Sequence, residues 1–254
     1  MVHFVGAGPG ALDLITVRGK NLLKKADIVI YAGSLVNPEL LDYAVNAKKI
    51  YNSAKMTLEE IVEVLKDADK NGLEVVRLHT GEPSVYGAVR EQMDELDKLS
   101  IAYDSCPGVT ACFGAAAVLN LEYTLPSVSQ TLIITRMAGR TGVPDREKLS
   151  ELAKHHASMA IYLSSSLLES VVKELYEAGY NEDDRCFLCY KVTWEDEKLI
   201  ECTLGDLVSQ AKSEGISNTA IVLVGGSISE FDHVRSRLYA PDFSTAFRNA
   251  KSDN

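Results

Sequence analysis

A glycine-rich turn close to the N-terminus has the spacing of a phosphate-binding loop. Gly6, Gly8 and Ala11 follow an apolar run and fit the pattern G-x-G-x-x-G/A, in which backbone N–H groups hold a dinucleotide pyrophosphate. Pro9 weakens that interpretation, because it removes one N–H group and restricts the backbone of the residue before it. A carboxylate that could bind a ribose is expected about 20 residues further on, where residues 31–34 (YAGS) have none. The pattern therefore favours a tight turn that could face a ligand cleft over a nicotinamide site.

Two further loops carry glycine and proline at places where parallel sheets bind ligands. The segment TGEPSVYG (80–87) ends the apolar run 74–80, and CPGVTA (106–111) follows the run 101–105. In a doubly wound sheet, ligands lie beyond the carboxyl ends of the strands. Gly81 and Gly108 would let a ligand approach the backbone closely. Each loop alone is better explained as an ordinary turn, and only together do they indicate an edge at which a site is expected.

Short β-branched runs alternate with amphipathic helices through the first half of the chain. The helix that begins near Thr57 has a well-defined start, because Thr57 and Glu60 form the capping box T-x-x-E. This alternation predicts a mostly parallel sheet with helices on both faces. The expected strands are 2–5, 27–31, 74–80 and 101–105, and the expected helices are 14–25, 38–44, 57–71, 85–99 and 109–119.

The segment 121–130 (LEYTLPSVSQ) interrupts this pattern and is typical of a domain linker. Further strands are expected at 131–136, 159–165, 186–194, 199–203 and 219–226. The two strands around residues 195–198 (EDEK) are close enough to form an antiparallel hairpin. The sequence therefore predicts two α/β domains, with a mostly parallel sheet in 1–120, a mixed sheet in 131–240 and a flexible tail over 241–254.

Composition and charge exclude several classes of protein. The 254 residues carry 36 acidic and 26 basic side chains, a net charge of −10, which disfavours a nucleic-acid partner. No apolar stretch approaches the roughly 20 residues of a membrane span, and the N-terminus lacks a signal-peptide pattern. Five cysteines without a disulfide framework are typical of reduced thiols in a cytoplasmic protein. Cys186 and Cys189 form a C-x-x-C pattern within an expected strand, so they point to opposite faces and we expect buried thiols and no metal site.

Five longer motifs follow one another along the chain: GAGPGALDLITVRG, RLHTGEPSVYGA, PGVTACFGAAA, ITRMAGRTGVP and TAIVLVGG. Together they resemble the tetrapyrrole (uroporphyrin-III C-methyltransferase-like) methylases over nearly all of residues 1–240. TGEPSVYGA, AGSLVNPELL (32–41) and TRMAGRTGVP are most similar to the group that methylates carbon 11 of precorrin-4 or cobalt-precorrin-4 in cobalamin synthesis. The resemblance implies two α/β domains with S-adenosylmethionine held in the cleft between them, a small-molecule tetrapyrrole substrate and a homodimer.

The resemblance also implies which residues contact the cofactor. Relatives read GGDP where this chain has TGEP (80–83), so Glu82 keeps the charge on a longer side chain. Relatives carry a Tyr-Met pair where this chain has Tyr162 and Leu163, which leaves only apolar packing. Matched to these motifs, the cofactor-binding residues are Pro9, Thr80, Gly81, Glu82, Val85, Thr110, Ala111, Tyr162, Leu163, Tyr190, Lys191, Thr219 and Ala220.

Methyl transfer from a sulfonium to an electron-rich carbon depends on positioning, since proximity can supply roughly 7–11 kcal/mol of the barrier. No catalytic residue is assigned, and the candidates for a base that removes a proton afterwards are Asp13, Glu82 and Tyr86. The substrate of such an enzyme carries several carboxylates, so local cations must outweigh the acidic net charge. The candidates to bind these carboxylates are Arg18, Arg136, Arg140 and His79.

Other activities stay open at this point. The same fold could methylate another ring carbon, which one sequence does not decide. A nicotinamide-dependent oxidoreductase would use the first glycine loop differently, and a non-catalytic module would bind the methyl donor without transferring its methyl group. Binding of NAD without binding of S-adenosylhomocysteine would distinguish the oxidoreductase from the methylases.

Overall fold

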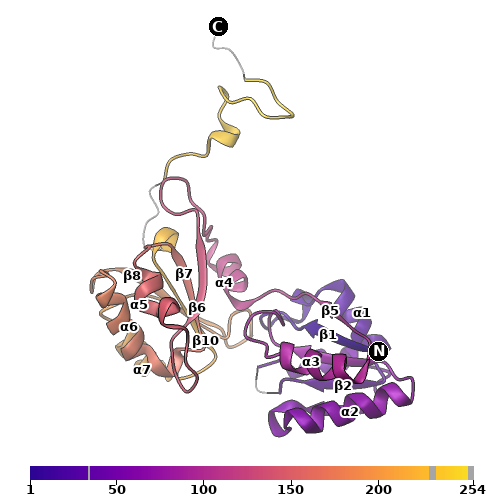
Figure 1. Ribbon diagram of the computed structural model, residues 1–254. Coiled ribbons are helices and arrows are strands. Elements are labelled where there is room, and N and C mark those ends of the chain that lie inside the picture. Colours follow the sequence, from indigo (N-terminus) through magenta and orange to yellow (C-terminus); the bar gives the residue numbers. More distant parts are fainter. Residues whose placement is uncertain (34, 229–232, 251–254) are drawn as a thin grey trace. The chain divides into compact units, whose positions relative to one another are not determined.

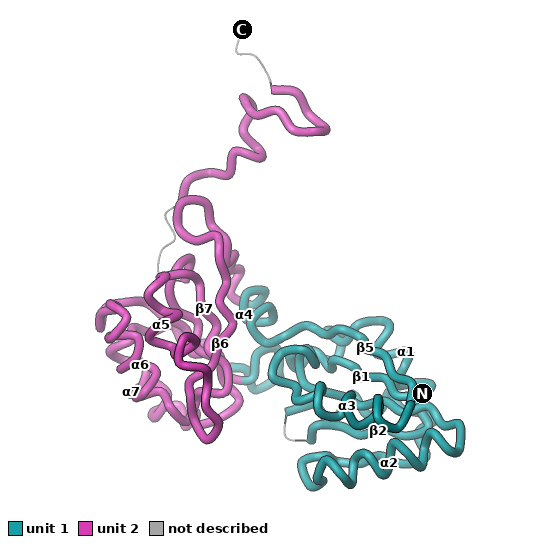
Figure 2. The backbone as a smooth tube through the Cα atoms, in the orientation of Figure 1, with its two compact units in different colours: residues 1–118, 191–197 teal, residues 119–190, 198–254 magenta. Residues whose placement is uncertain are grey.

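The computed structural model describes residues 1–33, 35–228 and 233–250, and its contacts group the chain into two compact units (Figure 2). Unit 1 consists of residues 1–118 and 191–197, and unit 2 of residues 119–190 and 198–254. The predicted boundaries at 120 and 131 stay a prediction. The grouping itself places the residues of the predicted linker in unit 2, and it assigns a short segment from the second half of the chain to unit 1.

The sheet of unit 1 is parallel throughout, with the strand order β3-β2-β4-β1-β5. Its strands β1, β2 and β5 are labelled in Figure 1. Its strands are β1 (Val2–Gly6), β2 (Ile28–Tyr31), β3 (Lys49–Asn52), β4 (Val75–His79) and β5 (Tyr103–Cys106). Strand β3 was not predicted, because it lies at an edge and its residues KIYN contain no buried apolar run.

Helices cover both faces of this sheet, as the alternation predicted. They are α1 (Val17–Lys25), α2 (Leu58–Lys70), α3 (Arg90–Leu99) and α4 (Ala111–Leu119). Alternate residues of β4 pack on opposite sides: Val75 belongs to the core with Leu65 of α2 and Leu96 of α3, whereas Val76 packs with Leu23 of α1. Short 3-10 helices occur at Leu12–Leu14, Pro38–Tyr43 and Ser53–Lys55.

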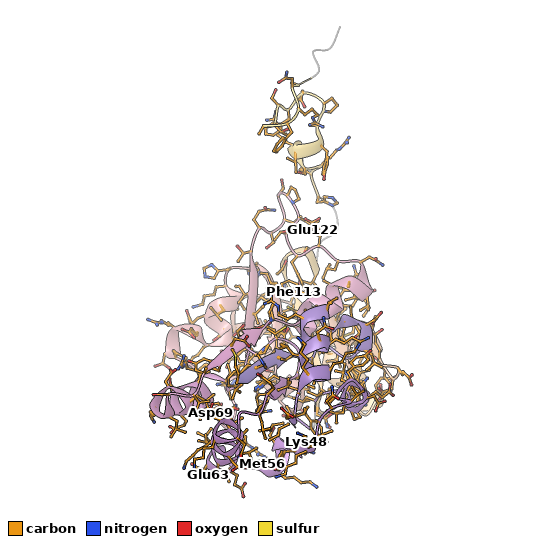
Figure 3. All side chains as sticks on the ribbon, turned by 90° about the vertical axis from the view of Figure 1, so that its right-hand side faces the viewer. Lys48, Met56, Glu63, Asp69, Phe113 and Glu122 are labelled. Carbon is orange, nitrogen blue, oxygen red and sulfur yellow. The ribbon has the colours of Figure 1, made fainter. Side chains whose placement is uncertain are left out.

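The ends of two helices show how local sequence acts here. The capping box of α2 is confirmed, since Thr57 Oγ1 accepts a hydrogen bond from the Glu60 N–H group and Glu60 Oε2 accepts one from the Thr57 N–H group. Glu63 and Asp69 lie on the exposed side of this helix (Figure 3). The predicted helix over 85–99 is wrong at its start, because Tyr86 and Ala88 have φ values of 56° and 49° and α3 begins only at Arg90.

The sheet of unit 2 is mixed, as predicted, with the strand order β6-β7-β10-β8-β9. Strands β6 and β7 are parallel and the other pairs are antiparallel. The strands are β6 (Leu132–Arg136), β7 (Ser158–Tyr162), β8 (Arg185–Tyr190), β9 (Lys198–Thr203) and β10 (Ala220–Val224). The helices are α5 (Leu149–Ala153), α6 (Leu168–Glu177) and α7 (Leu207–Ser213), with 3-10 helices at Asp145–Glu147, Ser165–Leu167, Gly226–Ile228 and Arg237–Tyr239.

The predicted hairpin between β8 and β9 is present, but its turn is longer than expected. The prediction of a strand over 186–194 is wrong beyond residue 190, because β8 ends at Tyr190 and a seven-residue turn, 191–197, follows. Lys191 and Thr193 in this turn have φ values of 43° and 68°, which a strand cannot accommodate.

The residues of the predicted linker pack on the unit 2 sheet. The Ser158 hydroxyl donates a hydrogen bond of 2.7 Å to the Tyr123 carbonyl, and the Ser129 hydroxyl accepts one of 3.2 Å from the Ser158 N–H group. In the described part of the predicted tail, Arg248 donates to the Ala240 and Phe243 carbonyls, and residues 251–254 lie outside the described residues. Among the described residues, no helix combines the length and apolarity that crossing a membrane requires.

Candidate functional site

Three loops at the carboxyl ends of β1, β4 and β5 are joined through their backbones. Gly81 donates a hydrogen bond of 2.9 Å to the Gly8 carbonyl, and Gly8 donates one of 3.3 Å to the Gly81 carbonyl. A Cβ atom on Gly6 would lie 2.6 Å from Gly108 Cα, so glycine is required where the first and third loops meet. The glycines thus serve backbone-to-backbone contact, which agrees with the tight turn favoured over a nicotinamide site.

The Glu82 side chain links the second and third loops. Its Oε2 atom accepts a hydrogen bond of 2.7 Å from the Gly108 N–H group, and its Oε1 atom accepts one of 3.0 Å from the Ser84 N–H group. Both carboxylate oxygens therefore bind backbone donors, an arrangement that fixes the second and third loops to each other.

Other predicted residues of unit 1 surround this junction. The Thr80 hydroxyl donates to the Leu35 carbonyl (3.0 Å), and Gly81, with a φ of 58°, faces the buried Thr110. Ala111 begins α4 directly after Thr110. Val85 is half-buried in the second loop, whereas Tyr86 is 43% exposed with a left-handed backbone.

His79 is placed differently from its predicted role. Its side chain is 3% exposed, and its Nε2 atom has no hydrogen-bond partner among the described residues. Burial, with a smaller contribution from the charge of Arg77, lowers the pKa of His79 to about 3. Arg77 is itself buried and donates to Gln92 Oε1 (2.9 Å) and to the Ile30 carbonyl (3.2 Å). A neutral, buried imidazole is at odds with a cation that binds a substrate carboxylate.

The first loop has partners that the sequence did not indicate. The Trp194 indole N–H group donates to the Pro9 carbonyl (3.0 Å), and Thr193 Oγ1 accepts from the Ala11 N–H group (3.0 Å). Both partners belong to the turn 191–197, which is part of unit 1. A Cβ atom on Gly10 would lie 2.1 Å from Trp194 Cδ1, so this glycine is required by the indole ring.

In unit 2, six predicted residues gather at one end of the mixed sheet. The strand register pairs Arg136 with Tyr162 and Tyr190 with Ala220. Because β7 and β10 are antiparallel, Leu163 and Thr219 flank the same end, where the Ser165 hydroxyl donates to the Ala220 carbonyl (2.8 Å). The Leu163 side chain is 60% exposed.

The arginine candidates differ in how their side chains are engaged. The Arg136 guanidinium donates to the carbonyls of Met137 (3.2 Å), Thr141 (3.1 Å) and Gly142 (2.7 Å), and so holds the loop in which Arg140 lies. Arg18 and Arg140 are exposed and form no ion pair with the residues that the structure describes. Asp13 is exposed in the 3-10 helix Leu12–Leu14.

Four predicted site residues have a left-handed backbone. Tyr86, Leu163, Lys191 and Thr219 have φ values of 56°, 52°, 43° and 52°. Residues other than glycine in this region carry strain of order 1–3 kcal/mol, and such strain concentrates at binding sites. No local sequence pattern indicated these conformations.

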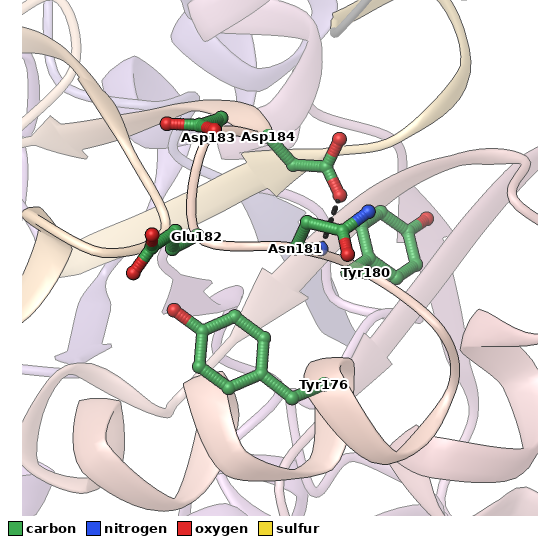
Figure 4. A pocket seen from close by; sticks show the side chains of 6 residues that line it. All are labelled: Tyr176, Tyr180, Asn181, Glu182, Asp183 and Asp184. Carbon is green, nitrogen blue, oxygen red and sulfur yellow. Dashed lines mark hydrogen bonds between the residues drawn. The ribbon is translucent and has the colours of Figure 1, made fainter.

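An acidic pocket in unit 2 lies among residues that were not predicted to bind anything. Its volume is about 640 Å³ and it is lined by Tyr176, Tyr180, Asn181, Glu182, Asp183 and Asp184 (Figure 4). Its three carboxylates would repel a polycarboxylate substrate. The C-x-x-C cysteines are both buried on β8, as expected, and Cys186 Sγ lies 3.6 Å from Cys202 Sγ on β9.

Comparison with known proteins gives a consistent result. A model of the family "Tetrapyrrole (Corrin/Porphyrin) Methylases" matches residues 1–208. The chain is 49% identical to a cobalt-precorrin-4 C(11)-methyltransferase of Methanocaldococcus jannaschii, covering 98% of this chain and 96% of that protein. It is 42% identical to a precorrin-4 C(11)-methyltransferase of Pseudomonas aeruginosa, covering 97% and 98%. A solved structure of a cobalt precorrin-4 methyltransferase matches with a TM-score of 0.84 and 44% identity, over 88% of this chain and 94% of that one.

Proposed function

The chain belongs to the tetrapyrrole (corrin/porphyrin) methylase family, and from this premise we propose that it methylates carbon 11 of precorrin-4 or cobalt-precorrin-4 in cobalamin biosynthesis. The observation that carries this function is the identity of 42–49%, over nearly the full length of both chains, with relatives named for that reaction. The methyl donor is S-adenosylmethionine, and the product of the donor is S-adenosylhomocysteine.

The residues at the junction of the three loops fit such a cofactor. Gly81 has a left-handed backbone, and a Cβ atom there would extend to 3.5 Å from Thr110 Cα, so its absence leaves room beside the backbone. In unit 2, Leu163 presents an apolar surface beside Thr219 and Ala220. We propose that these groups hold the cofactor, together with Pro9, Thr80, Glu82, Val85, Ala111, Tyr162, Tyr190 and Lys191. The expected cleft between two domains stays a prediction.

When bound, the cofactor supplies an electrophilic methyl group on a sulfonium. The chain contributes by fixing the loops that border it: Gly8 and Gly81 are bonded to each other, and Glu82 ties the second loop to Gly108. Orientation of this kind can supply roughly 7–11 kcal/mol of the barrier. Because both Glu82 oxygens accept backbone N–H groups, its role in this proposal is to position the loops, and Asp13 and Tyr86 remain the candidate bases.

Recognition of the substrate carboxylates is assigned to arginines. Arg18 and Arg140 are exposed and keep their guanidinium donors available among the described residues, which suits the planar, bidentate binding of carboxylates. Arg136 contributes by holding the loop that carries Arg140. These local cations would allow a chain of net charge −10 to bind a polyanion.

We also propose a homodimer in the cytoplasm. Helix α4 contains no polar side chain, and its Phe113 is 51% exposed (Figure 3), which provides an apolar surface that a second copy could cover. Five cysteine thiols suit a reducing compartment. Sedimentation equilibrium of the wild-type chain and of Phe113→Ser tests the dimer, which should weaken in the variant, and a monomeric wild type would contradict it.

The function is tested by incubating the chain with S-adenosylmethionine carrying a ¹³C-labelled methyl group and with precorrin-4, with or without cobalt. We expect one labelled methyl group in the product by mass spectrometry, at carbon 11 by NMR. A label at another ring carbon would identify a different tetrapyrrole methylase. Tight binding of NAD, without binding of S-adenosylhomocysteine, would overturn the methylase assignment.

A further inference from the structure

The turn 191–197 belongs to unit 1, and apart from Lys191, which is proposed to hold the cofactor, its residues have no role in the proposed mechanism. It connects β8 to β9, yet its contacts place it with residues 1–118. Hydrogen bonds within the turn fix its shape. The backbone N–H group of Trp194 donates to the Lys191 carbonyl (3.0 Å), and the backbone N–H group of Glu197 donates to the Trp194 carbonyl (3.2 Å). Lys191 and Thr193 hold left-handed backbones within it, so the turn is a defined structure maintained against strain.

Two side chains of this turn bind the first loop on either side of Gly10. Trp194 donates its indole N–H group to the Pro9 carbonyl, and Thr193 Oγ1 accepts the Ala11 N–H group, each at 3.0 Å. The ring lies against Gly10, where any Cβ atom would meet Trp194 Cδ1 at 2.1 Å. The loop therefore has no freedom to move toward the turn, and moving away from it would break both bonds.

The first loop in turn is bonded to the second. Gly8 exchanges two hydrogen bonds with Gly81, the left-handed residue of the loop that is proposed to hold the cofactor. One continuous path therefore runs from the Trp194 indole through Pro9 and Gly8 to Gly81. The Lys191 ammonium lies 5.3 Å from the Trp194 ring centroid and 2.6 Å from Asp196 Oδ2, so a cation–π contact within the turn also holds the indole.

We propose that Trp194 and Thr193 are positioning residues that set the Pro9–Ala11 loop, and through it Gly81, for binding of the methyl donor. This inference rests on the proposed function, because it concerns the affinity of the same site. Neither residue has to touch the cofactor for this effect, since a preformed loop avoids the cost of ordering on binding.

The test uses two variants that each remove one hydrogen bond. Trp194→Phe keeps an aromatic ring without the N–H donor, and Thr193→Val keeps the shape without the acceptor. Thr203→Val is the matched control, a half-buried threonine of β9 whose hydroxyl makes no hydrogen bond to the described residues. Loss of one such bond should raise the Kd for S-adenosylhomocysteine, measured by calorimetry, by up to about tenfold.

Three further measurements separate positioning from a general loss of structure. The KM for S-adenosylmethionine should rise with kcat unchanged, at a temperature where circular dichroism shows each variant folded. Trp194 is the only tryptophan, so its emission in the wild type and in Thr193→Val should change with S-adenosylhomocysteine over the same concentrations as the calorimetric titration. If Trp194→Phe does not fold, Thr193→Val decides the question alone.

The inference is overturned if a folded Trp194→Phe or Thr193→Val binds S-adenosylhomocysteine as tightly as the wild type. It is also overturned if Thr203→Val weakens binding as much as they do. Failure of the wild type to bind S-adenosylhomocysteine would instead contradict the proposed function, so the two failures are distinguishable.

Discussion

Replacement of Glu82 by glutamine separates a positioning carboxylate from a catalytic base. The Gly108 and Ser84 N–H groups donate to different oxygens of this carboxylate, at 2.7 and 3.0 Å. Whichever way the glutamine amide turns, its NH₂ group faces one of the two N–H donors, so one hydrogen bond is lost. A hydrogen bond to a charged group contributes about 1.5–3 kcal/mol net, which corresponds to about a 10- to 100-fold increase in local opening of the loops.

The assay is amide hydrogen exchange of Gly108 and Ser84 followed by NMR, compared between Glu82→Gln and the wild type. At least one of the two amides should exchange about 10- to 100-fold faster in the variant. Glu39→Gln is the matched control, because Glu39 is exposed and its carboxylate forms no ion pair with the described residues. Unchanged exchange at both amides would refute the positioning role. Turnover abolished with unchanged exchange and unchanged affinity for S-adenosylhomocysteine would restore Glu82 as a base.

Three further perturbations test other parts of the structure. Burial lowers the pKa of His79 from 6.5 to about 3, so as the pH falls His79 is protonated in the unfolded chain before it is protonated in the folded one. The free energy of unfolding is therefore unaffected by His79 above pH 6.5 and falls by about 1.4 kcal/mol per pH unit between pH 6.5 and pH 3. In urea titrations across this range, His79→Phe should reduce that slope. Arg136→Ala releases three loop carbonyls and should raise the KM for the tetrapyrrole more than that for the methyl donor, and equal increases in steady-state assays would contradict its role. Thr57→Ala should cost about 1 kcal/mol of unfolding free energy in urea. The control is Thr131→Ala, at an exposed threonine whose hydroxyl makes no hydrogen bond to the described residues, and an equal cost there would argue against the capping box.

Much of the architecture follows from local pattern. Alternating apolar runs and helices predicted the parallel sheet of unit 1, and the closeness of two strands predicted the antiparallel part of unit 2. The helix start at Thr57 was predictable because both partners of the capping box lie within four residues. The start predicted for α3 was too early, because Tyr86 and Ala88 adopt left-handed backbones. These residue types do not favour that conformation, so no local pattern could have predicted it.

The glycine-rich loops of the candidate site were recognisable in the sequence, whereas contacts between side chains distant in the chain were not. Gly81 and Gly108 were singled out because glycine would let a ligand approach the backbone, whereas in the structure both lie against the backbone of the first loop. Trp194 was missed because its partner Pro9 lies 185 residues away in the chain. The one sequence signal was Gly10, a third glycine in the first loop. The dinucleotide pattern does not require a glycine at this position, but the Trp194 indole ring does.

The hydrogen bonds that polar side chains make in the candidate site indicate how the protein contributes to catalysis. Both Glu82 oxygens accept backbone N–H groups, and the Arg136 guanidinium donates to three carbonyls of its own loop. Groups held in this way keep the loops at fixed distances. In-line methyl transfer to a carbon that is already nucleophilic depends mainly on such fixed distances. The roughly 7–11 kcal/mol that proximity can contribute is a large share of the roughly 8–23 kcal/mol by which enzymes lower barriers. Loops that are bonded glycine to glycine, as those of unit 1 are, therefore suit a reaction in which the substrate supplies the nucleophile and the protein supplies the geometry.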